Sequence, residues 1–386
     1  ISDTLKCLIR CFTCRDDDDI WSVNLKKHFG GRFSMAVCQA NENIEDRSQI
    51  EVGKHATFVG VYDGHGGHKA ANYVLNHLFN HYIDQIAKSG FMSESAIRHA
   101  IAATENGFIE AVRNAIETQP LMALEGCCCV IGVIWRSRLY VANLGDSRAV
   151  LGHSLPTDSV IVTVLPDQLT VVHNVNEENV RRELLVSHSL EAEPIITKDK
   201  GLHLIKNRIQ VSRSIGDAYL KYPELALPDI PIKKALLKAE PTMLTRDLQE
   251  YDKFLIFASG SLWEHLSNEE AGIAKRLVEE AQSRAAARAG ISFRQVKRAA
   301  VGKERRWVHD DITVVVIFLD YKLLSENSSG NGRFNLVRTP HAQLDESTIG
   351  FSDKTSQSKF HHLRHLTVVE GWPPLAASEF PTSYFY

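Results

Sequence analysis

The pattern of hydrophobic and polar positions predicts strands and helices in separate runs. Residues 33–39 alternate as a half-buried strand does, and residues 56–62 form an apolar run typical of a buried strand. In residues 68–87 and 95–118 the apolar positions recur with helical spacing, so both segments are expected to be helices with one buried face. Pro120 is expected to end the second helix.

The middle of the chain predicts an antiparallel meander. Apolar runs at residues 127–135, 138–144 and 159–165 are separated by short turns, as in consecutive hairpins. Two further strands are expected at residues 209–215 and 254–259.

The last third of the chain predicts helices, one strong strand and then a change of composition. Residues 176–190 and 268–300 have helical character, and residues 312–319 form the last strong strand. The segment ENSSGNG (326–332) then reads as a linker. The expected division is an irregular arm at 1–30, one domain at 31–320 and an irregular tail at 321–386. The expected fold class is α+β, a β-sandwich of antiparallel sheets covered by helices.

Composition narrows the class of protein. The chain has 386 residues, of which 44% are hydrophobic and 24% charged, as in ordinary globular proteins. A net charge of −3 gives no basic field for nucleic acid. We see no apolar run long enough for stable membrane insertion.

The seven cysteines do not resemble a disulfide framework. Cys38 and the run Cys127–Cys129 lie in apolar segments, which is typical of buried free thiols in a reducing compartment. An intracellular protein, cytoplasmic or nuclear, is therefore expected. Cys7, Cys11 and Cys14 allow a zinc site, lipid attachment with peripheral membrane contact, or simply an exposed arm.

Acidic residues recur next to the predicted strands. The stretch VYDGHGG (61–67) places Asp63 and His65 among glycines, which fits either a metal or phosphate site or an Asp-Gly hairpin turn. Further acids in such places are Glu45, Asp46, Asp146, Asp217, Asp310 and Asp311. Each alone is more simply a turn or cap residue. Together, if the strand ends converge, they would form a cup of oxygens that prefers Mg²⁺ or Mn²⁺.

Six segments make the chain resemble a known family. They are IEDRSQ (44–49), FVGVYDGHGG (58–67), LYVANLGDSRAVLG (139–152), IQVSRSIGDAYLK (209–221), DKFLIFAS (252–259) with LWEHLSNEEA (262–271), and HDDITVVVIFLD (309–320). In this order they resemble plant-type members of the type 2C metal-dependent protein serine/threonine phosphatases. The resemblance implies two packed antiparallel sheets with helices on both outer faces.

The resemblance also implies an activity and a site. A water bridging two Mg²⁺ or Mn²⁺ ions would hydrolyse phosphoserine and phosphothreonine in proteins. Asp63 would bridge both ions, with the Gly64 carbonyl and Glu45 on one and Asp310 on the other. Asp146 would belong to a looser third site, and His65 would be the general acid. A phosphorylated protein substrate or a kinase is the expected partner, and a monomer is expected.

One departure from the family pattern concerns the metal site. The family has Ser-Asp-Gly-Leu-Trp where this chain has Ser259-Gly260-Ser261-Leu262-Trp263, so a metal-ligand aspartate is missing at Gly260. This loss brings the occupancy of one ion into question. It also leaves an alternative, a catalytically impaired phosphatase fold kept for binding. Asn41 stands where many relatives have an arginine for the substrate phosphate, and a short segment is missing within residues 267–277.

Overall fold

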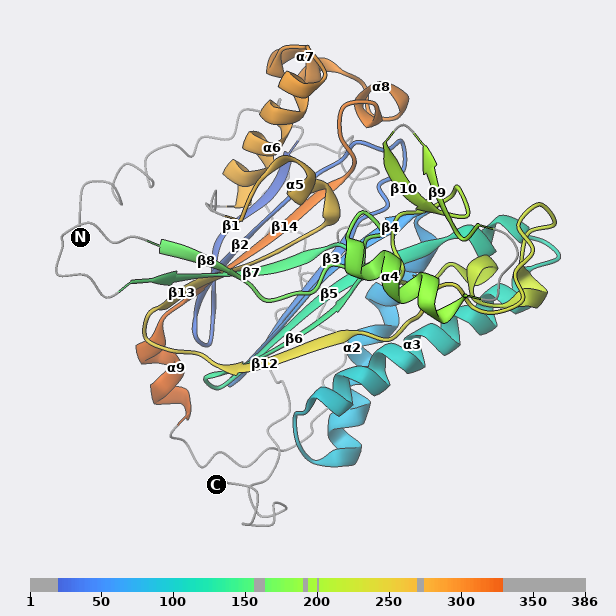
Figure 1. The fold of residues 1–386 in the computed structure, drawn as a ribbon. Coiled ribbons are helices and arrows are strands. Elements are labelled where there is room, and N and C mark those ends of the chain that lie inside the picture. Colours follow the sequence, from blue (N-terminus) through green and yellow to red (C-terminus); the bar gives the residue numbers. More distant parts are fainter. Residues whose placement is uncertain (1–19, 156–163, 190–193, 200, 269–273, 329–386) are drawn as a thin grey trace.

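Two antiparallel sheets form the centre of the computed structural model, which describes residues 20–155, 164–189, 194–199, 201–268 and 274–328 (Figure 1). In the first sheet the strand order is β1 (Ile20–His28), β2 (Gly31–Cys38), β14 (Ile312–Leu319), β13 (Asp252–Ala258), β7 (Arg148–Ser154) and β8 (Val164–Gln168). In the second it is β12 (Thr242–Asp247), β6 (Arg138–Leu144), β5 (Gly126–Trp135), β4 (Ala56–His65) and β3 (Arg47–Val52), with β11 (Ile215–Gly216) pairing to β5.

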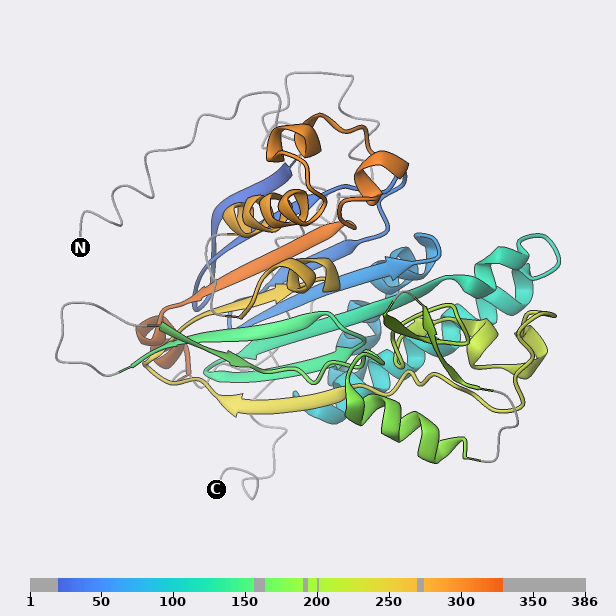
Figure 2. The same cartoon turned by 45° about the horizontal axis from the view of Figure 1, so that its top comes forward.

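Helices cover the outer faces of both sheets (Figure 2). The second sheet carries α2 (Lys69–Ser89), which packs in turn on α3 (Glu94–Ala115). The first sheet carries α6 (Ala274–Arg288), with α5 (Gly260–His265) beside it. The expected sandwich with helices on both sides is confirmed. None of the helices in the described residues is long and apolar enough to cross a bilayer.

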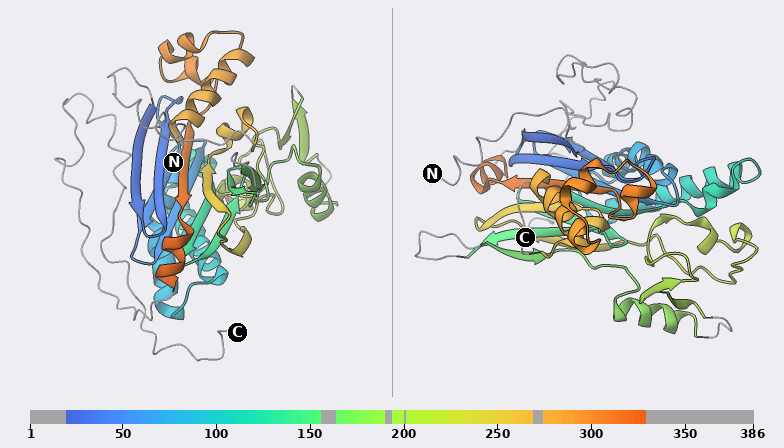
Figure 3. Two further views of the ribbon diagram at one scale, coloured as in Figure 1. Left: turned by 90° about the vertical axis from the view of Figure 1, so that its left-hand side faces the viewer. Right: turned by 90° about the horizontal axis from the view of Figure 1, so that it is seen from above.

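The remaining elements lie around the sandwich. They are α4 (Glu178–Ser187), α7 (Phe293–Arg298), α8 (Lys303–Arg306), α9 (Tyr321–Ser328), the hairpin β9 (Ile196–Asp199) and β10 (Leu202–Ile205), and the 3₁₀ turns Pro120–Leu124, Ala218–Leu220 and Pro223–Leu225. Figure 3 shows α4, β9 and β10 gathered at one end of the sandwich. Their segment has its own small core around Val175, Leu184 and Ile205.

Alternation along β4 explains how one strand serves two cores. Val59 and Val61 pack into the apolar layer between the sheets. Phe58 and Tyr62 point the opposite way and pack against α2 and α3. All four side chains are at most 1% exposed, so the strand is buried on both faces, as its unbroken apolar run predicts.

Both ends of the folded region extend beyond the expected bounds. β1 lies within the arm that we expected to be irregular, and it pairs with β2 from Ile20 opposite Cys38 to His28 opposite Gly31. Its pattern was hard to read because a register shift between Val23 and Lys26 interrupts the alternation. At the other end, α9 occupies the first residues of the expected tail, where Leu324 packs into the layer between the sheets.

Three expectations within the domain need correction. The chain does not continue as a meander, because β7 leaves the sheet of β5 and β6 and pairs with β13 in the other sheet. Within 209–215 only Ile215 is in a strand, since this segment is held by isolated bridges and side-chain contacts. The helix expected over 268–300 is two helices, separated by Gly290 at φ +69° and a capping box at Ser292.

One further expectation, for four of the cysteines, is confirmed, and others concern residues that the structure does not describe. Cys38, Cys127, Cys128 and Cys129 are buried free thiols, as predicted. The strand expected at 159–165 lies mostly outside the described residues, as do Cys7, Cys11, Cys14 and the chain after residue 328.

Candidate active site

The strand β4 carries the VYDGHGG motif further than expected. Instead of ending at Tyr62, it continues through His65, with Asp63 opposite Cys128 and His65 opposite Gly126. Alternation places Asp63 and His65 on the side that faces the other sheet. The chain turns only afterwards, at Gly66 (φ +70°) and Gly67 (φ +138°), so the interpretation of Asp63-Gly64 as a hairpin turn is wrong.

The position that lacks its aspartate lies between two carboxylates. The backbone N–H of Gly260, at the start of α5, donates to Oδ2 of Asp63 over 2.8 Å. A Cβ atom at Gly260 would lie 3.3 Å from Oδ2 of Asp63 and 3.0 Å from Oδ1 of Asp146. Asp146, in the turn between β6 and β7, accepts a 2.8 Å hydrogen bond from Nδ2 of Asn174. A side chain at 260 would therefore join the two acids.

Two N–H donors and one cation hold Asp310, and one of the donors is the backbone N–H of Asp311, which donates to Oδ1 of Asp310 over 2.8 Å. Its Oδ1 accepts from Nδ2 of Asn41 over 2.8 Å, and its Oδ2 pairs with Nη2 of Arg306 over 2.6 Å. The Asp310 side chain is 29% exposed, so it faces the open side of the site. Asn41, where the resemblance to the family leads us to expect an arginine, thus supports a predicted metal ligand.

Asp311 and Glu45 have different roles, although both belong to the predicted acidic set. Asp311 is 2% exposed and accepts from the backbone N–H groups of Ala40 (2.6 Å), Asn41 (3.0 Å) and Glu45 (2.8 Å). It is a clamp for the loop after β2. That loop presents Glu45 beside Gly64, where an added Cβ would lie only 2.5 Å from the Glu45 carbonyl oxygen. Only glycine fits there.

The acids raise one another's pKa values. Burial, together with the charges of Asp146 and Asp310, raises the pKa of Asp63 to about 8. Partial burial, with the charges of Asp310 and Asp311, raises the pKa of Glu45 to about 7. Burial raises the pKa of Asp310 as well. These acids therefore share one electrostatic environment, in which excess negative charge is costly.

The predicted general acid His65 has a buried partner. Its Nε2 lies 3.0 Å and 2.9 Å from the two carboxylate oxygens of Asp217. Burial by itself lowers the pKa of His65. The charge and hydrogen bond of Asp217, together with the charges of Asp63 and Asp146, more than offset burial and raise this pKa to about 9. Asp217 was expected in the oxygen cup; the structure bonds it to His65 instead.

The oxygen atoms at this end of the sandwich are of the kind that bind a hard divalent cation. Oxygen atoms of several carboxylates and the Gly64 backbone border the same end of the sandwich, and a cation would relieve the repulsion among the acids. Asp46 adds a buried Oδ2 that has no hydrogen-bond partner among the residues that the structure describes. The side chains are not closed into a ligand cage, since no group of three His, Cys, Asp or Glu residues in the described part of the chain is arranged to hold an ion.

Three residues interact with the acids in ways that the sequence does not predict. Arg306 pairs with Asp310 from the short helix α8, for which no periodic pattern exists. Glu264 of α5 is exposed, but partial desolvation and the charges of Asp146 and Asp310 raise its pKa, so it belongs to the same cluster. The partnership of Asn174 with Asp146 joins positions 28 apart in sequence and has no local signal.

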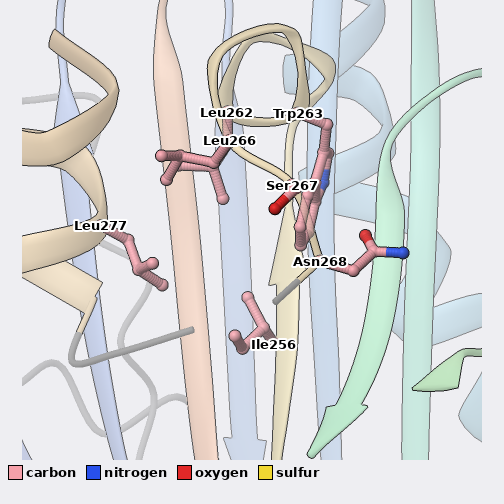
Figure 4. A pocket seen from close by; sticks show the side chains of 7 residues that line it. All are labelled: Ile256, Leu262, Trp263, Leu266, Ser267, Asn268 and Leu277. Atoms are coloured by element: carbon pink, nitrogen blue, oxygen red, sulfur yellow. The ribbon is translucent and has the colours of Figure 1, made fainter. Parts of the chain in front are cut away.

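A pocket near α5 is not part of this site (Figure 4). It is lined by Ile256, Leu262, Trp263, Leu266 and Leu277 together with Ser267 and Asn268. No described residue of the lining is an acid, a base or a thiol. The pocket is a gap in the apolar layer between α5, α6 and the first sheet, not a place for the carboxylate chemistry.

Comparisons with known proteins agree with this geometry. The sequence model of a family described as "Protein phosphatase 2C" matches residues 30–299. The protein named "Probable protein phosphatase 2C 25" of Oryza sativa subsp. japonica is 46% identical over 330 residues, which cover 81% of this chain and 84% of that protein. "Probable protein phosphatase 2C 68" of Arabidopsis thaliana is 45% identical over 363 residues, covering 89% and 88% of the two chains.

Solved structures support the fold. The serine-threonine phosphatase 2C from Toxoplasma gondii superposes with a TM-score of 0.52 at 16% identity, covering 78% of this chain and 99% of that one. A C. elegans sex determining protein gives the same TM-score at 19% identity, with 78% and 68% covered. At such identities the likeness concerns the fold alone.

The sequence matches decide the family. The family model covers most of the sandwich, the two plant relatives match 81% and 89% of the chain, and the family generally depends on Mg²⁺ or Mn²⁺. Nothing in the comparisons favours the binding-only alternative. The chain belongs to the protein phosphatase 2C family and is a plant-like, metal-dependent protein serine/threonine phosphatase.

Proposed function

We propose that the carboxylate cluster at the end of β4 is the site of phosphate ester hydrolysis. Asp63 would contact two divalent ions, with Glu45 and the Gly64 carbonyl on one and Asp310 on the other. Asp146 would serve a looser third position. The observation that carries the proposal is the closeness of the acids: position 260 lies between Asp63 and Asp146, and the charge of Asp310 helps to raise the pKa values of both Asp63 and Glu45, so a bound cation would relieve their repulsion.

The reaction would form a bond between a water oxygen and phosphorus and cleave the bond between phosphorus and the serine or threonine oxygen. When bound, Mg²⁺ or Mn²⁺ supplies Lewis-acid charge and makes water a stronger nucleophile. As the bond breaks, its electron pair passes to the departing oxygen, and protonated His65 would donate a proton there. The products are the free hydroxyl group and inorganic phosphate. Asp63 and His65 thus act from one strand, two residues apart.

Gly260 is proposed to weaken one ion site without removing the cluster. Its N–H still bonds Asp63, so the loop keeps its position next to the missing ligand. Loss of even an outer-shell partner typically lowers metal affinity by about 10–100-fold, and loss of a direct ligand should cost at least as much. We therefore expect two ions, one of which binds more weakly.

A phosphatase assay with a metal-ligand control tests the proposal. The full chain should release phosphate from a phosphothreonine peptide in Mn²⁺ or Mg²⁺ and lose this activity in excess chelator. Asp63→Asn keeps the size of the side chain but removes its charge, so turnover should fall by at least about 100-fold. Asp252→Asn is the matched control, because it makes the same substitution at a buried acid at the opposite end of β13 from Gly260.

One outcome of this assay would contradict the proposal. If the wild type hydrolyses the peptide no faster than Asp63→Asn, the proposed site is wrong. Counting bound Mn²⁺ in the same samples then separates a site that holds no metal from one that holds metal without turnover.

A further inference from the structure

We propose that Asp217 is a positioning residue that holds His65 in the orientation needed to protonate the leaving group. The inference rests on the proposed role of His65 as the general acid. It assigns a function to the motif SRSIGD (212–217), which the metal site does not use.

The pair is built asymmetrically. Asp217 is 0% exposed, and both of its carboxylate oxygens lie within 3.0 Å of Nε2 of His65. The His65 side chain is 27% exposed, and its Nδ1 makes no hydrogen bond within the described residues. With Nε2 bonded to Asp217, the ring presents Nδ1 as the atom that can reach a departing oxygen.

The Asp217 carboxylate is itself fixed. The hydroxyl of Ser214 donates to Oδ2 of Asp217, and the backbone N–H of Asp217 donates to the carbonyl of Glu125 over 2.9 Å. The backbone of Asp217 is left-handed, at φ 49° and ψ 44°. Aspartate and asparagine tolerate this conformation better than most residues, and a strained backbone of this kind is often found at functional sites.

A buried ion pair supports the same loop from the side of α3. Glu105 accepts from the N–H of Gly216 over 2.9 Å and from Nζ of Lys221 over 2.7 Å. Lys221 donates in turn to the Ser214 carbonyl over 2.7 Å. Buried ion pairs add little net stability, so their value here is the defined shape they give to the loop that carries Asp217.

Gly126 shows how closely the pair is packed. A Cβ atom at this position would collide with the Asp217 carboxylate and with Nε2 of His65. Gly126 lies opposite His65 in the β4–β5 ladder. A methyl group there would therefore displace the pair while leaving both of its members in the chain.

The test compares two substrates in saturating Mn²⁺. A phosphothreonine peptide needs a proton on its leaving oxygen, whereas p-nitrophenyl phosphate releases an anion that is stable without one. Asp217→Asn fits the left-handed backbone but removes the charge that orients the ring. We expect kcat for the peptide to fall about 10-fold or more while kcat for p-nitrophenyl phosphate changes by less than about threefold.

Three companion variants make the outcomes distinct. His65→Gln should show the same split between substrates, and larger, at about 100-fold on the peptide. Gly126→Ala should lower kcat for the peptide more than for p-nitrophenyl phosphate, although Asp217 and His65 are both present. This variant replaces Asp217→Asn in the test if Asp217→Asn does not fold. Asp252→Asn, a buried acid far from the pair, should leave the ratio of the two kcat values unchanged.

The outcomes separate the inference from the function on which it rests. If His65→Gln lowers kcat equally for both substrates, His65 is not the general acid. The positioning role of Asp217, which rests on that role, is then wrong as well. If His65→Gln shows the split but folded Asp217→Asn and Gly126→Ala do not, Asp217 is only structural and the inference alone is overturned.

Discussion

At the scale of a single residue, Gly260 leaves the proposed metal site with one negative charge fewer than an aspartate would give. The space for a side chain there is bounded by Asp146 and Asp63, and the backbone N–H keeps its bond to Asp63. The position is therefore intact in shape and altered in charge. A substitution that adds one carboxylate should act mainly through the metal.

Gly260→Asp should accordingly have opposite effects with and without metal. In chelator we expect a lower melting temperature, because a third acid is added between two others that already repel. In Mn²⁺ we expect about 10–100-fold tighter binding of the weaker ion and a matching gain in phosphopeptide hydrolysis at limiting Mn²⁺. Calorimetric titration and the phosphatase assay measure the two effects.

The isosteric control separates charge from fit. Gly260→Asn places the same number of atoms at position 260, where the added Cβ has contacts of 3.0 and 3.3 Å. If Asn and Asp change Mn²⁺ affinity alike, the missing negative charge is not what limits the site.

The sequence predicts single site residues better than their partners. Asp63, His65, Asp310 and Glu45 lie in short motifs whose resemblance to a family is clear, although their assigned roles stay predictions. The bond between His65 and Asp217 joins positions 152 apart and depends on how β5 and β11 pair. Whether an acid near a strand end becomes a ligand or a clamp, as Asp311 does, depends on backbone amides brought near by folding.

Among the elements, β1 depends on a buried histidine. Nδ1 of His28 lies 3.1 Å from the hydroxyl of Thr57 in β4, and Nε2 lies 3.2 Å from the Phe318 carbonyl in β14. The residue thus ties the edge strand to both sheets. Burial lowers the pKa of His28 to about 4, against the opposing effect of the Phe318 carbonyl.

This histidine should make stability depend on pH. Between about pH 6.5 and 4 the unfolded chain binds a proton that folded His28 does not, so the free energy of unfolding falls as pH falls through this window. The contribution is at most about 3 kcal/mol. His28→Gln should lower stability at pH 7 but flatten the slope below pH 6.5, measured by urea unfolding.

The control for this prediction is an exposed histidine. His99→Gln on α3 should leave both the stability and the slope unchanged. A His28→Gln protein with the wild-type slope would show that other groups, such as buried His173 and His265, carry the acid sensitivity.

Long elements with one clear period were predictable, and short ones held by distant contacts were not. The helix at Lys69–Ser89 and the strand at Ile312–Leu319 match their expected bounds within two residues. β11 has only two residues and exists because it pairs with β5. The assignment of β7 to the other sheet is a matter of topology, which local periodicity does not encode.

At the scale of the whole molecule, the carboxylates come from segments of both sheets. Asp63 lies in β4 of the second sheet, two residues before its end, and Asp310 precedes β14 in the first. A cation held between them would link the two halves of the sandwich and relieve their repulsion. Metal binding should therefore be visible in global stability as well as in activity.

Mn²⁺ should raise the melting temperature of the wild type in proportion to the logarithm of its concentration. At 100 times the dissociation constant the gain is about 2.7 kcal/mol. Asp63→Asn should melt above the wild type in chelator, since it removes a half-buried acid whose pKa is raised, and should gain little from Mn²⁺. Scanning calorimetry with and without chelator measures both.

Equal Mn²⁺ shifts in the two proteins would place the stabilising ion elsewhere. Asp252→Asn again serves as the comparison, because its stability change should be the same in metal and in chelator.

Glu125 makes a hydrogen bond to each of two segments that border the site. Its side chain accepts from the N–H of Lys69 at the start of α2, and its carbonyl accepts from the N–H of Asp217. The helix that follows the glycine turn and the loop that carries Asp217 therefore share one anchor. Local unfolding at Glu125 would free both segments at once. Activity would then be lost under conditions in which the two sheets are still folded.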